Sequence, residues 1–477
     1  MDVEAAESAP SSSSFDLAEQ LLRLQEDDLD LEYDVASFDS EAQQSHITRI
    51  VDAVALSATS VQDANIYQCI LCSIKCVGSM HSDLSHRLLD TLLSGMNVIL
   101  DEIADMEPTA VASYTEPLER YAFLLKWMTE MMEKHRDQYG STDKGQKRAA
   151  PSTRKGDVSW TWTSSLPSVL TLMSKTLRIA SERMWSSKAM RDTFVSRCIL
   201  QPVMLCLENE AYLKVQVIKQ GMFKVLCLAV KLHGQAFNVQ TSILQALQYY
   251  EHLAEPMAEL LGVMRTDFDI ERLGEDVLRD LAAKSFTSLD TKSPRSFGRF
   301  LVRMTELNPR TVLKQMSLLE RQQESESYPI RNAMIEVHGL LIKYLSMSED
   351  DVDIAPNEDD EDDDRSAPQK QMDMLFERLF ERFLDLTTFV RTKVIQVCSK
   401  LCDIPAKLPA QRLRMTSLAI RSLEDKGSHV RRNAISLLIK LLLTHPYGVL
   451  HGGELDARVW TERRDVVRAE LAKAEER

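Results

Sequence analysis

Apolar side chains recur three and four positions apart through most of this chain, a spacing that places them on one face of an α-helix. The runs fill residues 41–132, 159–347 and 369–477. Strands would instead show alternating apolar and polar residues, often joined by Asn-Gly turns. The sequence has neither a sustained alternating stretch nor an Asn-Gly pair. The pattern therefore predicts an all-α protein.

Three polar segments interrupt the helical pattern. Residues 1–40 are rich in Ser and in acidic residues, residues 133–158 are basic and contain Gly, Ser and Pro, and residues 348–368 are strongly acidic. Segments of such composition cannot bury enough apolar surface to fold alone. We expect a disordered N-terminal arm with at most one short helix, followed by an N-terminal helical domain at 41–132. We expect the other two segments to be disordered inserts, one a basic linker and one acidic.

The later helical runs contain an internal repeat. Ile330, Val390 and Val430 are each followed by Arg, two further residues and then apolar residues along one helical face. Val390 and Val430 lie 40 positions apart, and Ile330 precedes Val390 by 60 positions because the acidic insert lies between them. Without that insert of about 20 residues the period is near 40, as in HEAT repeats.

HEAT repeats are helical hairpins that stack because one hairpin cannot bury both of its apolar faces. Weaker units begin near Leu213 and Ser293, ahead of the clear repeats. The sequence thus predicts a HEAT-repeat α-solenoid over residues 159–347 and again over the more basic residues 369–477. Stacking also creates a long curved surface, which repeat proteins use for binding.

Charged residues recur with the repeat. Asp385 lies six positions before Arg391, and Asp425 lies six before Arg431. This pattern resembles that of HEAT proteins, which have an Asp in the turn between the paired helices and an Arg early in the second helix. The resemblance implies that these four residues form a structural ladder of charges along the stack. In the first segment Ser325 occupies the Asp position, and no ladder contact is predicted there.

Composition favours a repeat array. The chain has 477 residues, which exceeds the usual size of a domain with a single hydrophobic core. It contains only 15 Gly and 15 Pro, few for a sheet protein, whose hairpins need such turn residues. Its eight Cys lie in apolar surroundings, as expected of reduced thiols. The N-terminus lacks the apolar core of a signal peptide, and no apolar run reaches the ~18–20 residues of a membrane span. We therefore expect an intracellular protein that does not associate with membranes.

The most specific similarity lies in the block from Phe389 to Tyr447, which reads FVRTKVIQVCSKLCDIPAKLPAQRLRMTSLAIRSLEDKGSHVRRNAISLLIKLLLTHPY. This block resembles the condensin subunit 1 family of HEAT-repeat regulatory subunits. The stretch SPRSFGRFLVRMTELNPRTVLKQMSLL, from Ser293 to Leu319, also resembles that family, as does the region from Trp185 to Leu207. The resemblance covers roughly residues 160–450.

The resemblance implies a non-catalytic subunit that binds the condensin kleisin and the SMC ATPase subunits, and that helps condensin load on chromatin and compact mitotic chromosomes. It also implies the nucleus and chromosomes as the location, with a cytoplasmic pool. Family members are longer, and the helical pattern runs through AELAKAEER to the last residue without a signal that would end the helix. We therefore expect it to be incomplete at the C-terminus.

The helices from 369 to 445 carry fourteen Lys or Arg against seven Asp or Glu, a net charge of +7 within a chain of net charge −15. Contact with a phosphate backbone needs only such positive charge on one face. A solvated helix face with internal Asp–Arg pairs explains the same composition. The candidates for DNA contact outside the ladder are Lys393, Lys400, Arg412, Arg414, Arg432 and Lys440.

Each of the two polar inserts can be interpreted either as a solvated loop or as a segment with a function of its own. The acidic residues 349–364 are most simply a solvated loop, although they could instead compete with DNA for the nearby basic helices. The basic linker, with Lys147 and Arg148, could be a solvated connection, a nuclear import signal or a DNA-touching loop. Trp160 and Trp162 after it are expected to pack its end onto the helices.

Cys69, Cys72 and Cys76, with His81 and His86 nearby, could suggest a metal site. Their spacing of three and four instead places the three Cys on one helical face, where they pack as small apolar side chains. No metal and no cofactor is predicted. Ser293-Pro294 could be a phosphorylation site, but Ser as N-cap followed by Pro is also a common helix start.

The sequence contains no GxxxxGK[ST], GxGxxG, HExxH or GxSxG motif. It therefore gives no reason to expect an enzyme or a small-molecule substrate. A HEAT-repeat adaptor of another class, such as a nuclear transport receptor or a phosphatase scaffold, remains the alternative function.

Overall fold

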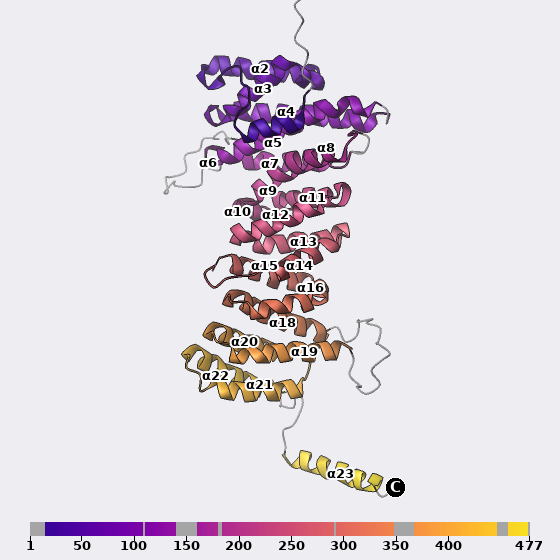
Figure 1. The fold of residues 1–477 in the computed structure, drawn as a ribbon, viewed down its shortest axis with the longest axis vertical. Coiled ribbons are helices and arrows are strands. Elements are labelled where there is room, and N and C mark those ends of the chain that lie inside the picture. Colours follow the sequence, from indigo (N-terminus) through magenta and orange to yellow (C-terminus); the bar gives the residue numbers. More distant parts are fainter. Residues whose placement is uncertain are drawn as a thin grey trace, which may run out of the picture. The chain divides into compact units, whose positions relative to one another are not determined.

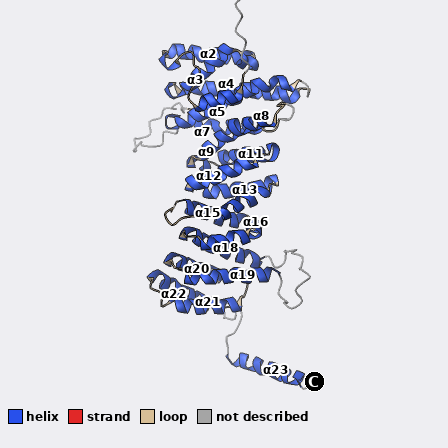
Figure 2. Ribbon diagram, in the orientation of Figure 1, coloured by secondary structure: helices blue, strands red, loops and turns tan. Residues whose placement is uncertain are grey.

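A computed structural model describes residues 15–107, 110–139, 160–179, 184–290, 292–347, 367–445 and 457–475. These residues form helices joined by short loops, and they contain no strand (Figures 1 and 2). The all-α, helical-repeat class predicted from the sequence is thereby confirmed. None of the helices in these ranges is both long enough and apolar enough to cross a bilayer.

The chain divides into two compact units, which are described separately. Unit 1 is Met1–Ile243 with Asp267–Ile270, and unit 2 is Leu244–Thr266 with Glu271–Arg477. The domain boundaries predicted from the sequence were placed at the polar segments. Of those segments, residues 1–14, 140–159 and 348–366 lie outside the described residues, as do Lys147 and Arg148.

Unit 1 is built around α5, whose buried face packs against α3, α4 and α9. The helices of this unit are α1 (Leu17–Gln25), α2 (Ser40–Leu56), α3 (Ala64–Lys75), α4 (Ser82–Asp105), α5 (Thr115–Lys134), α6 (Arg136–Tyr139), α7 (Trp162–Thr176), α8 (Lys188–Thr193), α9 (Gln201–Leu207), α10 (Glu210–Lys214) and α11 (Gln216–His233). A π-helical segment, η6 (Phe194–Leu200), joins α8 to α9, and α12 (Ala236–Tyr249) crosses the division between the units.

Residues 15–40 belong to the predicted N-terminal arm, for which the sequence allowed one short helix. They include α1, whose N-terminus is capped by the Asp16 carboxylate, and a short 3₁₀ turn at Val35–Ser37. Leu17 and Val35 are buried. A few well-placed apolar residues therefore anchor this acidic stretch, because the rest of unit 1 supplies a surface that the stretch lacks by itself.

Unit 2 contains two rows of helices. Its helices are α13 (Ala254–Phe268), α14 (Arg272–Ala283), α15 (Ser293–Leu307), α16 (Pro309–Lys314), α17 (Met316–Leu319), α18 (Tyr328–Met347), α19 (Ala367–Glu381), α20 (Thr388–Leu401), α21 (Pro409–Ser422), α22 (Ser428–Leu443) and α23 (Ala457–Glu475). In what we call the second row, α15 packs on α18, α18 on α20 and α20 on α22. The first row contains α14, α16 with α17, α19 and α21.

The predicted repeat coincides with this second row. The helices α18, α20 and α22 begin at Tyr328, Thr388 and Ser428, 60 and 40 residues apart, as the sequence repeat indicated. Ile330, Val390 and Val430 are all buried at the equivalent position. Gly339 lets α18 and α20 approach closely, because a Cβ there would collide with the Val397 side chain. The stacking of these helices therefore depends on a buried apolar residue at the same position of each helix, and on the small Gly339 where α18 and α20 approach closely.

The start of α15 differs in detail from the prediction. Ser293 is the first helical residue rather than the N-cap, and it is buried. The Asp290 carboxylate instead accepts hydrogen bonds from the backbone N–H groups of Lys292 and Ser293, at 3.1 Å each. A carboxylate serves this position well, because it satisfies two helix-end donors at once.

Candidate binding surface on the second row of unit 2

Arginine and aspartate side chains link successive repeats at the start of the second-row helices. Arg331 donates from Nε and Nη2 to the Asp385 carboxylate, at 3.0 and 3.1 Å. Arg391 makes the same pair of bonds to Asp425, at 2.6 and 3.0 Å. Each arginine therefore reaches the aspartate of the next repeat rather than the one six residues before it. Arg331 joins this ladder although Ser325 occupies its own repeat's Asp position.

Each ladder arginine also holds its own turn. Nη1 of Arg391 donates to the carbonyl oxygens of Asp385 and Leu386, at 2.7 and 3.1 Å. Arg431 makes the equivalent bonds to Asp425 and Lys426, but no bond to a carboxylate is found for it among the described residues. The hydrogen bonds from Arg391 hold the pKa of the Asp425 carboxyl below its usual value. A ladder arginine such as Arg391 therefore holds the turn of its own repeat and also binds the aspartate of the next repeat.

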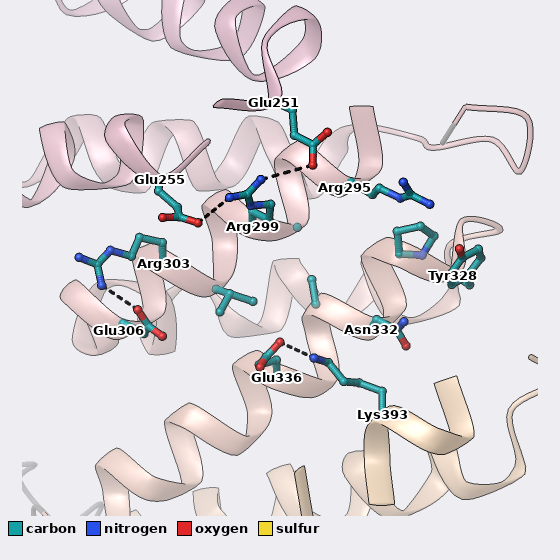
Figure 3. Close-up of a pocket in the computed structure, with 14 residues that line it drawn as sticks. Glu251, Glu255, Arg295, Arg299, Arg303, Glu306, Tyr328, Asn332, Glu336 and Lys393 are labelled. Atoms are coloured by element: carbon teal, nitrogen blue, oxygen red, sulfur yellow. Dashed lines mark hydrogen bonds and ion pairs between the residues drawn. The ribbon is translucent and has the colours of Figure 1, made fainter. Parts of the chain in front are cut away.

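A charged pocket of about 470 Å³ lies between α15 and α18 (Figure 3). Its basic residues are mostly paired: Arg299 lies 3.3 Å from Glu251 and 2.8 Å from Glu255, and Arg303 lies 2.9 Å from Glu306. Lys393 of α20 lies 2.7 Å from Glu336 of α18. Figure 3 shows these contacts as dashed lines. The remaining basic residue, Arg295, is exposed and has no ion pair among the described residues.

A second pocket of about 510 Å³ lies between α18 and α20, towards their C-terminal ends. It is more apolar, with Leu340, Met347 and Ile404 in its lining. Glu306 and Glu336 line both pockets, so the two depressions adjoin at these residues. We refer to the two adjoining pockets together as the groove.

Three of the predicted DNA-contact residues project from the second row, and each has a carboxylate partner. Lys393 and Lys400 flank Glu336, with Lys400 Nζ 3.3 Å from the carboxylate. Lys440 lies 2.7 Å from Asp403. The two lysines jointly lower the pKa of Glu336 through hydrogen bonds, against the effect of its burial. Part of their positive charge is therefore neutralised within the stack.

The other three predicted DNA-contact residues differ from one another. Arg412 donates to the carbonyl oxygen of Cys402 at 2.8 Å and to Oγ1 of Thr444 at 3.0 Å. Its guanidinium therefore stabilises the packing between helices. Arg414 pairs with Glu377 and lies over the Phe380 ring, 5.0 Å from its centroid. Arg432 is exposed and without an ion pair in the described part of the chain. The structure does not bring all six residues onto one face, since Arg412 and Arg414 belong to the first row.

Cys69, Cys72 and Cys76 lie buried in and just after α3 as free thiols. Tyr33 donates to Cys69 Sγ at 3.0 Å, and burial raises the pKa of Cys76 to about 11. His86 stacks instead on Trp160, with ring centroids 4.9 Å apart. Within the described ranges, no group of three or more His, Cys, Asp or Glu residues could hold a metal ion.

The sequence did not reveal a buried carboxylate in unit 1. Glu133 Oε1 accepts hydrogen bonds from Trp162 Nε1 at 2.6 Å and from Tyr212 Oη at 2.7 Å. Burial raises the pKa of Glu133 despite these bonds. Glu119, also on α5, accepts from Trp185 Nε1 at 2.7 Å. Trp162 therefore anchors the start of α7, as predicted for the residues after the linker, but through a polar partner on a distant helix.

Comparison with known proteins places these features in a family. The family model described as "non-SMC mitotic condensation complex subunit 1, N-term" matches residues 82–239. The chain is 30% identical over 475 residues to condensin complex subunit 1 of Schizosaccharomyces pombe, covering 96% of this chain and 39% of that protein. It is 29% identical to the Saccharomyces cerevisiae protein of the same name, covering 81% of this chain and 32% of that one. Solved structures align only loosely, for example a homology model of the AP-3 complex with a TM-score of 0.32 and 10% identity over 90% of this chain and 87% of that one.

The stacked hairpins and their charge ladder define an all-α HEAT-repeat protein. The similarity extends further towards the N-terminus than the predicted 160–450. The chain belongs to the condensin complex subunit 1 family, and it spans about two fifths of the length of its Schizosaccharomyces pombe relative.

Proposed function

We propose that this chain is part of a regulatory scaffold subunit of condensin, which binds the kleisin and the SMC ATPase subunits for mitotic chromosome condensation. The observation that carries the proposal is the similarity over 96% of the chain to a condensin complex subunit 1. In this function the chain catalyses no reaction and needs no cofactor. The location that follows is the nucleus and chromosomes, with a cytoplasmic pool.

The geometry supports a scaffold through its rigid second row. Ladder bonds between Arg331 and Asp385, and between Arg391 and Asp425, fix neighbouring repeats relative to each other. A surface held in this way loses little conformational entropy when a partner binds, which favours affinity. An extended segment such as a kleisin could therefore lie across the second row at small entropic cost.

DNA contact is the further part of this function. Arg432 and the exposed Lys400 supply positive charge on the second row. Because contacts to phosphates are independent of base sequence, the expected binding is weak, salt-dependent and non-specific. The DNA would lie along the stack rather than in a pocket.

Reconstitution tests the scaffold proposal. The chain is co-expressed with the kleisin and the two SMC ATPase subunits of its own species, and the mixture is separated by size-exclusion chromatography. We expect the chain to elute with the kleisin, and the complex to persist in an Arg432→Glu control because this residue lies outside the ladder. Capture from mitotic nuclear extract provides the second readout. Reproducible recovery of transport or phosphatase subunits, without kleisin or SMC proteins, would contradict the proposal.

A further inference from the structure

The groove formed by the two adjoining pockets has a mixed chemical lining. Its five carboxylates are each matched by Arg or Lys: Glu251, Glu255, Glu306, Glu336 and Asp403. Two cations are not matched: Arg295 at one end and Lys343 towards the other are exposed, without an ion pair among the described residues. The groove therefore offers two separate positive charges to a ligand.

Arg295 does not continue the ladder. The ladder arginines Arg331, Arg391 and Arg431 are each the fourth residue of their helix, whereas Arg295 is the third residue of α15. No carboxylate partner of Arg295 is found among the described residues, so its charge is available to a ligand of the groove.

The other end of the groove is apolar next to its free cation. Met347 is 58% exposed at the end of α18, and Leu340 and Ile404 lie in the same depression. Exposed apolar surface beside a cation suits a ligand with an apolar side chain close to a carboxylate. A duplex phosphate backbone fits this lining poorly, because it has no apolar side chain to place in the depression lined by Leu340, Met347 and Ile404.

The separation of the two cations sets the length of the ligand. From the helical rise and the spacing of packed helices, the Arg295 and Lys343 positions lie on the order of 20 Å apart. An extended chain covers that distance with about six residues. Side chains two positions apart point to the same side of such a chain.

We propose that this groove binds an extended acidic segment of a partner protein. One carboxylate pairs with Arg295, and a second carboxylate, about six residues further along, pairs with Lys343. An apolar side chain two residues beyond it enters the depression lined by Leu340, Met347 and Ile404. The inference rests on the proposed scaffold function, and it names the surface and the chemistry of one partner segment.

The test uses the full chain and a labelled synthetic peptide. The peptide has Asp at positions 1 and 7, Leu at position 9, and Ser or Thr elsewhere, and its binding is followed by fluorescence anisotropy. We expect Arg295→Glu and Lys343→Glu each to weaken binding about tenfold or more. Met347→Asp weakens it similarly, whereas Arg432→Glu, an exposed cation outside both pockets, leaves it unchanged. Circular dichroism verifies that each variant is folded.

A charge swap separates a specific contact from general attraction. A peptide with Lys at position 1 should bind the Arg295→Glu variant better than it binds the original chain, and moving the second Asp by three positions should weaken binding. Equal binding of all peptides, equal weakening by Arg432→Glu, displacement by duplex DNA at equal concentration, or no binding at 1 mM would each overturn the proposal. Because no condensin subunit is present, failure here leaves the reconstitution result standing.

Discussion

Arg391 Nε donates to the carboxylate of Asp425 at 2.6 Å, although the two residues belong to successive repeats and lie 34 positions apart in sequence. A second bond from Nη2, at 3.0 Å, makes the contact bidentate. Both side chains are largely shielded from solvent, with 16% of Arg391 and 12% of Asp425 exposed. Shielding and paired geometry make such contacts stronger than ordinary surface ion pairs.

The ladder contact leads to a prediction on stability. Arg391→Ala should lower the free energy of unfolding by about 2–3 kcal/mol, because it removes the bidentate contact and leaves the Asp425 carboxylate without its arginine partner. Arg431→Ala is the matched control, since in the described part of the chain Arg431 makes the turn contacts without a bond to a carboxylate. It should cost about 1 kcal/mol. Urea unfolding followed by circular dichroism measures both, and equal losses would contradict the importance of the bond between repeats.

The buried carboxylate of unit 1 leads to a second prediction. Glu133→Ala should lower the free energy of unfolding by about 3 kcal/mol, because it leaves the Trp162 and Tyr212 donors buried and unsatisfied. Glu133→Gln retains an acceptor oxygen and should cost about 1 kcal/mol. A double-mutant cycle with Tyr212→Phe measures the coupling, and additive losses would show that the two groups do not act through this bond.

His338 makes part of the stability dependent on pH. It is buried, with Nδ1 2.6 Å from the Met334 carbonyl oxygen and Nε2 2.9 Å from Gln323 Nε2. Burial lowers the pKa of His338 to about 4, and Arg382 and Arg378 act in the same direction. Between pH 6.5 and 4 the unfolded chain therefore binds a proton that the folded chain does not.

As pH falls through this window, the free energy of unfolding should decrease by up to about 3 kcal/mol, whereas above pH 6.5 this contribution is constant. The His338→Gln variant should show a weaker pH dependence between 6.5 and 4. Hydrogen–deuterium exchange at the imidazole carbon, read by mass spectrometry, gives the pKa directly. Titration of His338 near 6.5 would disprove the prediction.

The DNA-contact candidates should divide into two groups. Lys400→Glu and Arg432→Glu, on the second row, should weaken binding to duplex DNA and reduce the slope of affinity against salt by about 1 for each phosphate that is no longer neutralised. Arg412→Ala should instead lower thermal stability, since its guanidinium holds the Cys402 carbonyl. Anisotropy titrations at several salt concentrations measure the slope. If the slope of DNA affinity against salt is unchanged in both Lys400→Glu and Arg432→Glu, these two residues do not contact DNA.

The acidic insert leads to a prediction that rests on the sequence alone. If residues 349–364 compete with DNA for the basic helices, their deletion should raise DNA affinity at low salt, and the gain should disappear as salt screens the charges. Replacing the segment with a Gly/Ser linker of equal length controls for chain length. Unchanged affinity at low salt would end this hypothesis.

The local pattern of the chain was sufficient for much of the fold. The spacing of Ile330, Val390 and Val430 predicted where α18, α20 and α22 share a register, because one apolar stripe per helix determines which face is buried. The block from Phe389 to Tyr447 indicated the family that the comparisons then showed. Both depend on neighbouring positions in sequence, which a helix converts directly into neighbouring positions in space.

Contacts between distant segments were decided only by the tertiary structure. The sequence presented Asp385 and Arg391 as members of one repeat, but stacking brings Arg391 to Asp425 and Arg331 to Asp385. It presented Arg412 as a candidate DNA contact, whereas packing directs that side chain onto a backbone carbonyl. The sequence thus determined which residues form helices and which faces are apolar. Which charges remain free depends on long side chains meeting across repeats, and only the packed stack decides that.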